Sequence, residues 1–215
     1  MPSSSIEELS INRQTPGRTL PGRTLLASLA VLGFAVSATA CDSSVGATPQ
    51  DDDPGFEVVS AATLTPGEPV PVPAGEVILS MSGAISTANV DGRLDLDMAT
   101  LESMGTVAYS VDDEQAEGRV VRFEGVLLSD VLAVAGVSTA ATTLVTTALN
   151  DYSIDIPLSD ASESPVMIAT RVDGERMPVD RFGPTRVVYP YSSHDLDHVV
   201  YDPRWIWQLA SIVVR

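Results

Sequence analysis

The middle of the chain carries the stretch Gly125-Val126-Leu127-Leu128-Ser129-Asp130-Val131-Leu132. From Leu128 onward its apolar residues recur at the spacing of one helix face. Ser129 is of the residue type that commonly caps a helix N-terminus, and Gly136 suits the left-handed position that ends a helix. We therefore predict a short helix here, capped by Ser129 and terminated by Gly136.

Segments on either side of this helix predict strands and one more short helix. Asp97 is a suitable N-cap for a helix that stops near Gly105, and residues 112–118 predict an acidic loop. Asp173-Gly174 is a strong turn signal. Runs of β-branched and apolar residues predict strands at 77–83, 142–149, 152–156, 166–172, 187–189 and 205–214. Short strands with a few short helices indicate an α+β fold with mixed β-sheets over residues 76–215.

Residues 1–40 have the features of an export signal. Arginines precede an uncharged run from Leu25 to Ala38, and small residues then lead to Cys41, the only cysteine. A basic start, an apolar stretch of about 7–15 residues and small residues before a cleavage point define a secretory signal. Small residues directly before a cysteine also resemble a bacterial lipoprotein signal, although an ordinary signal peptide is the alternative. We expect export, and a lipid on Cys41 that anchors the protein at the periplasmic or extracellular face of the cell membrane.

Residues 41–75 predict an extended tether, because they are rich in Ser, Thr, Asp, Pro and Gly. Without residues 1–40 the chain holds 27 acidic and 9 basic residues, a net charge of −18, and it contains no lysine. This charge argues against nucleic acid as a partner, because phosphate neutralisation needs a basic patch. It equally disfavours attachment to an anionic bilayer through charge alone.

Five motifs resemble one family in their order and spacing. They are Gly125–Leu132, Ala148-Leu149-Asn150-Asp151-Tyr152, Asp173-Gly174-Glu175-Arg176-Met177-Pro178, Gly183-Pro184-Thr185-Arg186-Val187-Val188-Tyr189-Pro190 and Trp205-Ile206-Trp207-Gln208-Leu209. Together they resemble the molybdopterin-binding oxidoreductase domain of the sulfite oxidase superfamily, over about residues 77–215. The resemblance implies a sulfite oxidase-like molybdopterin-binding fold. The resemblance is strongest to the small, single-domain exported members of the family. For these it implies a domain that keeps the fold but has no enzymatic activity.

The departures from this family concern the molybdenum site. The resemblance implies that the enzymes hold molybdenum through a cysteine thiolate in a loop, and the corresponding residues 147–151 include no cysteine. A soft thiolate is the ligand type that anchors such a metal. Ile206-Trp207 also stands where the resemblance implies a phosphate-binding lysine. We therefore expect no molybdenum, no other metal and no catalytic residues, with a molybdopterin-dependent oxidoreductase as the alternative.

The candidate site residues suit a flat heterocycle such as a pterin, which needs a stacking surface and polar groups along its edge. These residues are Asn150 and Asp151 for the edge, Tyr109, Trp205 and Trp207 for stacking, and Arg186 for a carboxylate or phosphate tail. Each also has a purely structural interpretation. Asn150-Asp151 suits a turn, the two tryptophans suit the core face of one strand, and Arg186 suits a surface ion pair.

His194 and His198 lie among carboxylates, but the surrounding serines and Pro203 predict a solvated loop rather than a metal site. The sequence thus predicts a lipid-anchored protein that binds a pterin-like molecule without molybdenum. The resemblance further implies that it reports this ligand to a membrane signalling partner. A protein-interaction module with no small ligand is the remaining alternative.

Overall fold

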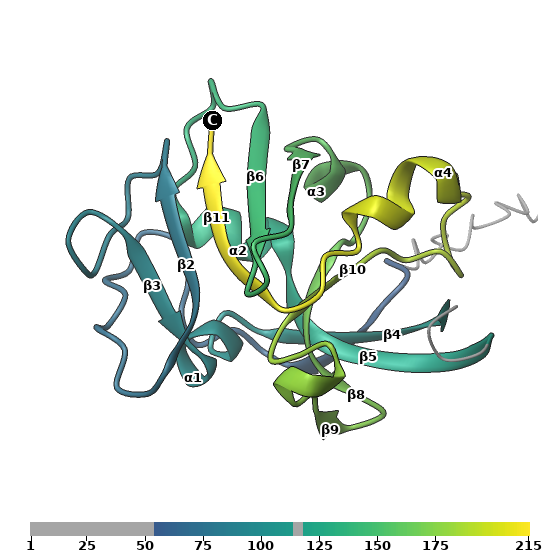
Figure 1. Cartoon of the computed structure of the whole chain (residues 1–215). Coiled ribbons are helices and arrows are strands. Elements are labelled where there is room, and N and C mark those ends of the chain that lie inside the picture. Colours follow the sequence, from purple (N-terminus) through teal and green to yellow (C-terminus); the bar gives the residue numbers. More distant parts are fainter. Residues whose placement is uncertain (1–53, 114–117) are drawn as a thin grey trace, which may run out of the picture. The chain divides into compact units, whose positions relative to one another are not determined.

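The computed structural model describes residues 54–113 and 118–215 (Figure 1). The predicted export signal, Cys41 and the first part of the predicted tether lie outside these residues, as does the centre of the predicted acidic loop. None of the helices in the described part of the chain has the length and hydrophobicity of a membrane span.

Two β-sheets form the framework of the described residues. The first contains, in order, β1 (Glu57–Ser60), β4 (Thr106–Asp113), β5 (Arg119–Leu127), β8 (Met167–Val172) and β10 (Arg186–Val188), and β9 (Glu175–Arg176) pairs with β8. The second contains, in order, β3 (Leu94–Asp97), β2 (Val77–Gly83), β11 (Leu209–Val214), β6 (Thr143–Ala148) and β7 (Ser153–Pro157). In Figure 1, β2, β11 and β6 stand upright while β4 and β5 run across the lower part. Because β2 pairs in parallel with β11 and antiparallel with β3, the predicted mixed sheet is confirmed.

Short helices connect the strands. They are α1 (Met98–Glu102), α2 (Leu128–Ala135), α3 (Asp160–Glu163), α4 (His198–Tyr201) and the 3-10 helices η2 (Val179–Arg181) and η3 (Asp202–Arg204). Asp97 caps α1 as predicted, since its Oδ1 accepts a hydrogen bond from the backbone N–H of Thr100 at 2.8 Å. Gly136 ends α2 as predicted, in the left-handed conformation with φ 63°.

The predicted cap of α2 is wrong. Leu127 occupies the N-cap position and makes no side-chain hydrogen bond there, because β5 runs directly into the helix. The backbone N–H of Leu128 donates instead to the carbonyl of Val166 at 2.8 Å. The carbonyl of a neighbouring segment thus accepts a hydrogen bond from an N–H group at the helix N-terminus. In other helices a capping side chain commonly satisfies such a group.

Asp97 also holds the segment that precedes β2. Its Oδ2 accepts hydrogen bonds from the backbone N–H groups of Ala74 and Gly75, both at 2.9 Å. The hydrogen bonds from Thr100, and after them those from Gly75 and Ala74, lower the pKa of Asp97 from 3.8 to about 2. One buried carboxylate therefore joins a helix N-terminus to a loop.

We expect Asp97→Ala to lower the free energy of unfolding by about 2 kcal/mol at neutral pH, the upper range for the loss of an N-cap. A carboxylate whose pKa is lowered in the folded state stabilises it above the unfolded pKa of roughly 3.9. This stabilisation is lost as the pH falls through about 2. The difference between wild type and variant in urea denaturation should therefore shrink from neutral pH to roughly pH 2–3. A difference that does not change with pH would contradict this role for Asp97.

Most predicted strands are confirmed, and the exceptions have local causes. The strands predicted at 77–83, 142–149, 152–156, 166–172 and 187–189 match β2, β6, β7, β8 and β10 to within one residue at each end. The strand predicted at 205–214 begins only at Leu209, because η3 precedes it and Gln208 has a left-handed φ of 53°. Trp205 and Trp207 therefore do not share a strand face.

Asp112 and Asp113 belong to β4, so the acidic loop begins later than predicted.

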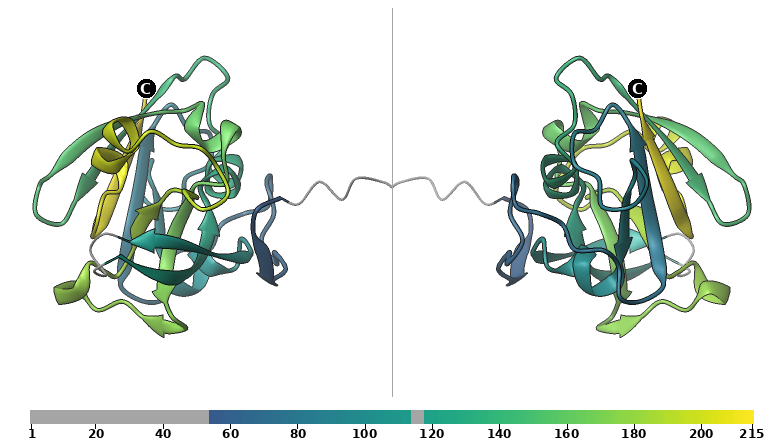
Figure 2. Two further views of the ribbon diagram at one scale, coloured as in Figure 1. Left: turned by 90° about the vertical axis from the view of Figure 1, so that its right-hand side faces the viewer. Right: turned by 90° about the vertical axis from the view of Figure 1, so that its left-hand side faces the viewer.

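The tether predicted over residues 41–75 extends too far. Within it, β1 pairs with β4, at the edge of the first sheet (Figure 2, dark blue). Leu64 and Val70 are buried in the core, each 9% exposed. The backbone N–H groups of Thr63 and Leu64 donate to the carbonyl of Ser103 at 2.8 and 2.9 Å. Two well-placed apolar side chains and backbone pairing thus fasten a segment whose composition predicts an extended chain.

The buried residues form two clusters. The larger includes residues of β2, β3, β6, β11 and α2, and the smaller includes residues of β4, β5, β8 and β10. Trp205 packs against both clusters from the segment between η3 and β11. This tryptophan therefore lies where the two halves of the core meet.

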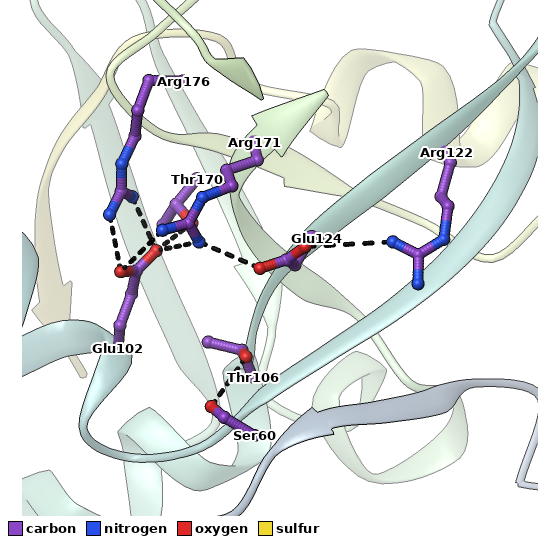
Figure 3. Close-up of polar contacts among 8 residues, drawn as sticks. All are labelled: Ser60, Glu102, Thr106, Arg122, Glu124, Thr170, Arg171 and Arg176. Atoms are coloured by element: carbon purple, nitrogen blue, oxygen red, sulfur yellow. Dashed lines mark hydrogen bonds and ion pairs between the residues drawn. The ribbon is translucent and has the colours of Figure 1, made fainter. Parts of the chain in front are cut away.

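A charged network joins α1 to the first sheet (Figure 3). Glu102 accepts hydrogen bonds from the hydroxyl of Thr170 at 2.6 Å and from the guanidinium groups of Arg171 and Arg176 at 2.7 and 2.6 Å. Arg171 also pairs with Glu124 at 2.9 Å. These arginines are thus already paired with carboxylates of the chain, so the network serves to attach α1 to β8 and β9.

Candidate functional site

A hollow of about 300 Å³ lies between the β6–β7 turn and the segment that precedes β11. This volume is at the lower end of the range for small-molecule sites, about 300–1,000 Å³. Its lining consists of Ala148, Asn150, Tyr152, Asp202, Pro203, Trp205, Ile206, Trp207 and Gln208. The two indoles, a phenol, two amides and a carboxylate give it both stacking surfaces and polar groups.

Backbone hydrogen bonds hold the wall formed by residues 205–208. The N–H of Val187 in β10 donates to the carbonyl of Ile206 at 2.9 Å, and the N–H of Gln208 donates to the carbonyl of Phe182 at 3.1 Å. The N–H of Leu149 donates to the carbonyl of Gln208 at 2.9 Å, which joins this wall to the β6–β7 turn. Ile206 is almost completely buried and anchors the segment in the core. The hollow is therefore built on rigid elements.

Other aromatic rings pack against the two indoles. The ring of Trp205 meets Phe123 edge-on with centroids 6.1 Å apart, and it stacks with Tyr191 at 5.5 Å. The ring of Trp207 contacts Phe182 at 4.4 Å between centroids. Such contacts restrict the indoles, so little freedom is lost when a flat ligand stacks on them.

Arg186 lies among these rings. It does not line the hollow, where it was predicted to bind a carboxylate or phosphate tail. Only 3% of Arg186 is exposed. Its guanidinium carbon is 4.8 and 5.7 Å from the ring centroids of Trp205 and Trp207, and 5.2 and 5.8 Å from those of Phe123 and Phe182. A cation over aromatic faces is attracted by their quadrupoles. Arg186 therefore supports the aromatic wall from inside the domain.

Asp202 also lines the hollow and is held by two neighbours. The hydroxyl of Tyr191 donates to its Oδ1 at 2.6 Å, and Nδ1 of His198 lies 3.0 Å from the same oxygen. Tyr191 and His198 also stack on each other, with centroids 4.2 Å apart. The segment predicted as a solvated loop around His198 thus contains the short helix α4 and orients a carboxylate. Among the described residues, no group of three or more His, Cys, Asp or Glu side chains is arranged to hold a metal.

The structure brings three of the six predicted ligand residues to the hollow: Asn150, Trp205 and Trp207. Asp151 does not line it; with a φ of 65°, it occupies the turn between β6 and β7. Asn150 contributes to the same turn, because its Oδ1 accepts a hydrogen bond from the N–H of Tyr152 at 3.1 Å. The turn interpretation therefore describes both residues, and Asn150 additionally faces the hollow.

Tyr109 is a core residue and not a stacking surface. It is 8% exposed within the smaller core cluster, and its hydroxyl donates to the carbonyl of Val188 at 2.8 Å. Burial raises the pKa of Tyr109 well above its usual value. Its place in the middle of β4, a strand that was not predicted, explains why the sequence misplaced it.

Sequence reasoning missed Tyr152, Gln208 and the role of Asp202. Tyr152 directly follows the quoted Asn150-Asp151 pair, and its hydroxyl donates to the carbonyl of Pro203 across the hollow at 3.1 Å. Only Arg204 separates Asp202-Pro203 from Trp205. Their closeness in sequence to recognised motifs is the signal that could have found them.

Comparison with known proteins gives a family match for the central part of the chain. Residues 98–193 match the family model of the oxidoreductase molybdopterin binding domain. This match agrees with the recognition made from the sequence motifs over residues 98–193, and the two sheets with a few short helices are of the expected α+β type.

Among solved structures, the chain is similar to the sulfane dehydrogenase SoxCD from Paracoccus pantotrophus. The two are 16% identical with a TM-score of 0.47, over 63% of this chain and 37% of that chain. The chain thus spans little more than a third of the length of that protein. No curated protein matches the chain.

The lining of the hollow does not fit a molybdenum cofactor. The only cysteine of the chain, Cys41, lies outside the described residues, so none of the lining residues offers a thiolate. Asp202 is the one charged residue among those that line the hollow in the described ranges, and a phosphate would meet its negative charge. The nearby cation, Arg186, is enclosed by rings. These groups suit an uncharged or proton-donating organic ring.

Proposed function

We propose that this protein is an exported lipoprotein that binds a flat, pterin-like heterocycle without molybdenum and reports it to a membrane signalling partner. The observation that carries the proposal is the hollow with two supported indoles, an amide and a carboxylate around about 300 Å³. The lipid anchor rests on Cys41 and the preceding apolar run, and the signalling role rests on the resemblance to small exported members of the family.

A pterin matches the chemistry of this lining. Its bicyclic ring offers two faces for stacking, and its edge carries both hydrogen-bond donors and acceptors. Trp205 and Trp207 provide the apolar surface, and Asn150 and Asp202 provide polar groups. Sites of this kind bind through a few well-placed polar groups on a mainly apolar lining.

Tryptophan fluorescence reports on this site directly, because Trp205 and Trp207 are the only two tryptophans of the chain. Titration of the full-length protein in detergent with a tetrahydropterin should quench their emission in a saturable way. Absence of saturation below about millimolar ligand, the weak end of specific affinities, would overturn the proposed function.

We expect Trp207→Ala to weaken tetrahydropterin binding by roughly tenfold to a hundredfold, as is typical for the loss of one stacking partner. Calorimetry is the appropriate measurement, since the substitution also removes one of the two fluorescent tryptophans. Tyr109→Phe is the matched control, because it alters an aromatic residue that does not line the hollow, and it should leave the affinity unchanged. Equal affinities of wild type and Trp207→Ala would contradict stacking on this indole.

A further inference from the structure

We propose that Asp202 selects the ligand by pairing with two adjacent N–H groups on its edge. The inference rests on the proposed function and makes it more specific. In a pterin these donors are the ring N–H and the neighbouring amino group, which together form an amidine-like edge. The hollow should therefore prefer 2-amino heterocycles over otherwise identical 2-oxo heterocycles.

The contacts of Asp202 leave one oxygen for a ligand. Oδ1 accepts the hydrogen bond from the hydroxyl of Tyr191 and also contacts Nδ1 of His198. Oδ2 has no hydrogen bond to any residue within 54–113 and 118–215. The side chain is 48% exposed, so a ligand in the hollow can reach it. A carboxylate oxygen has two acceptor positions, so Oδ2 can accept hydrogen bonds from both N–H groups of the ligand edge.

The two neighbours also fix the orientation of the carboxylate. Tyr191 and His198 approach from two different segments and stack on each other, which restricts the rotation of the Asp202 side chain. The following residues of η3 are anchored as well, because Arg204 donates to the buried Asp160 at 2.7 Å. A pre-oriented acceptor loses little entropy on binding, which favours a charge-assisted contact with a planar partner.

No other carboxylate in the described ranges lines the hollow. Asp151 belongs to the turn and does not line it. The Oδ1 of Asn150 already accepts the N–H of Tyr152, which leaves its amide N–H groups to meet a ligand carbonyl. The hydroxyl of Tyr152 and the amide nitrogen of Gln208 already donate to the carbonyls of Pro203 and Val179. Asp202 is therefore the charged acceptor of the lining, and Asn150 supplies a donor. This division matches the donor pair and the adjacent carbonyl along the edge of a pterin.

The test compares two ligands on three proteins by calorimetry, with full-length protein in detergent. The ligands are tetrahydropterin and tetrahydrolumazine, in which an oxo group replaces the 2-amino group. The proteins are the wild type, Asp202→Asn, and the matched control Asp151→Asn. Asp151→Asn also removes a nearby exposed carboxylate and so separates a specific contact from a general change of charge. Thermal unfolding of each variant checks that it folds.

The wild type should bind tetrahydropterin roughly tenfold to a hundredfold more tightly than tetrahydrolumazine, as expected for a charge-assisted contact. Asp202→Asn should reduce this preference to about threefold or less, and Asp151→Asn should preserve it. A wild type that binds both ligands equally overturns the role of Asp202 while the proposed function stands, and this comparison holds even if Asp202→Asn fails to fold. If Asp202→Asn folds and still prefers tetrahydropterin as strongly as the wild type does, the role of Asp202 is overturned as well. A wild type that binds neither ligand overturns the proposed function along with it.

Discussion

Gly125→Ala should destabilise the protein by more than about 4 kcal/mol, a magnitude that point substitutions reach only exceptionally. Gly125 lies in β5 where β5 pairs with β8, and the register shifts at this point. A Cβ atom there would come within 2.2 Å of the carbonyl oxygen of Ile168 and 2.6 Å of the Cα of Ala169. Both contacts are with backbone, so no side-chain rotation can relieve them. The two central strands would have to separate and lose their hydrogen bonds.

Urea denaturation followed by circular dichroism measures this effect, and Gly174→Ala is its control. Gly174 has a φ of 84° in the turn after β8, and a Cβ atom there meets nothing within 4 Å. Its replacement should cost only the backbone strain of a left-handed residue, about 1–2 kcal/mol. Since total stability is about 5–15 kcal/mol, this loss is a large part of it and should shift the urea midpoint far down. Equal effects of the two substitutions would contradict the close approach of β5 and β8.

Asp160→Ala should have the second largest effect, a loss of about 3–5 kcal/mol, as for the removal of one partner from a buried ion pair. Asp160 is 4% exposed. Its Oδ2 accepts hydrogen bonds from the hydroxyl of Tyr189 and from Arg204, each at 2.7 Å. Burial, and after it the contact with Asp160, raises the pKa of Tyr189, so this phenol remains a donor. The substitution leaves both a phenol and a largely buried guanidinium without this acceptor.

Tyr189→Phe separates the two parts of that loss. It removes one neutral hydrogen bond and should cost only about 1 kcal/mol in urea denaturation. Asp160→Ala should also change the fluorescence of Trp205 and Trp207, because Arg204 attaches η3 beside them. A loss of stability no greater than that of Tyr189→Phe would show that the ion pair contributes little. Unchanged tryptophan emission would show that η3 does not depend on Asp160.

Local signals in the sequence predicted individual elements well. Asp97 as a cap and Gly136 as a helix end are confirmed, because capping and left-handed backbone depend on residues next to each other in the chain. Ser129 was wrong because the strand–helix junction before it is satisfied by Val166, which is distant in sequence. The tether boundary was wrong for the same reason, since Leu64 and Val70 find partners elsewhere in the fold.

The site was predicted in part because two of its walls come from recognised motifs. Asn150 and Trp207 line the same hollow because the N–H of Leu149 donates to the carbonyl of Gln208, a contact that joins the two motifs. Which carboxylate lines the hollow could not be predicted. Asp151 and Asp202 carry the same functional group. Asp151 lies inside one recognised motif, and Asp202 lies shortly before another. Only the direction of a turn and the position of η3 distinguish them.

The sequence by itself indicated the resemblance to one family and located β2, β6 and β7 of the second sheet, and it predicts a lipid anchor at Cys41. Those conclusions depend on motif order, residue periodicity and composition, which are properties of short stretches. The tertiary structure alone decided that Arg186 is enclosed by four rings, that Tyr109 is core and that Asp202 faces the hollow. The physical reason is that burial and side-chain contacts arise between segments that are far apart along the chain and meet only when the two sheets pack.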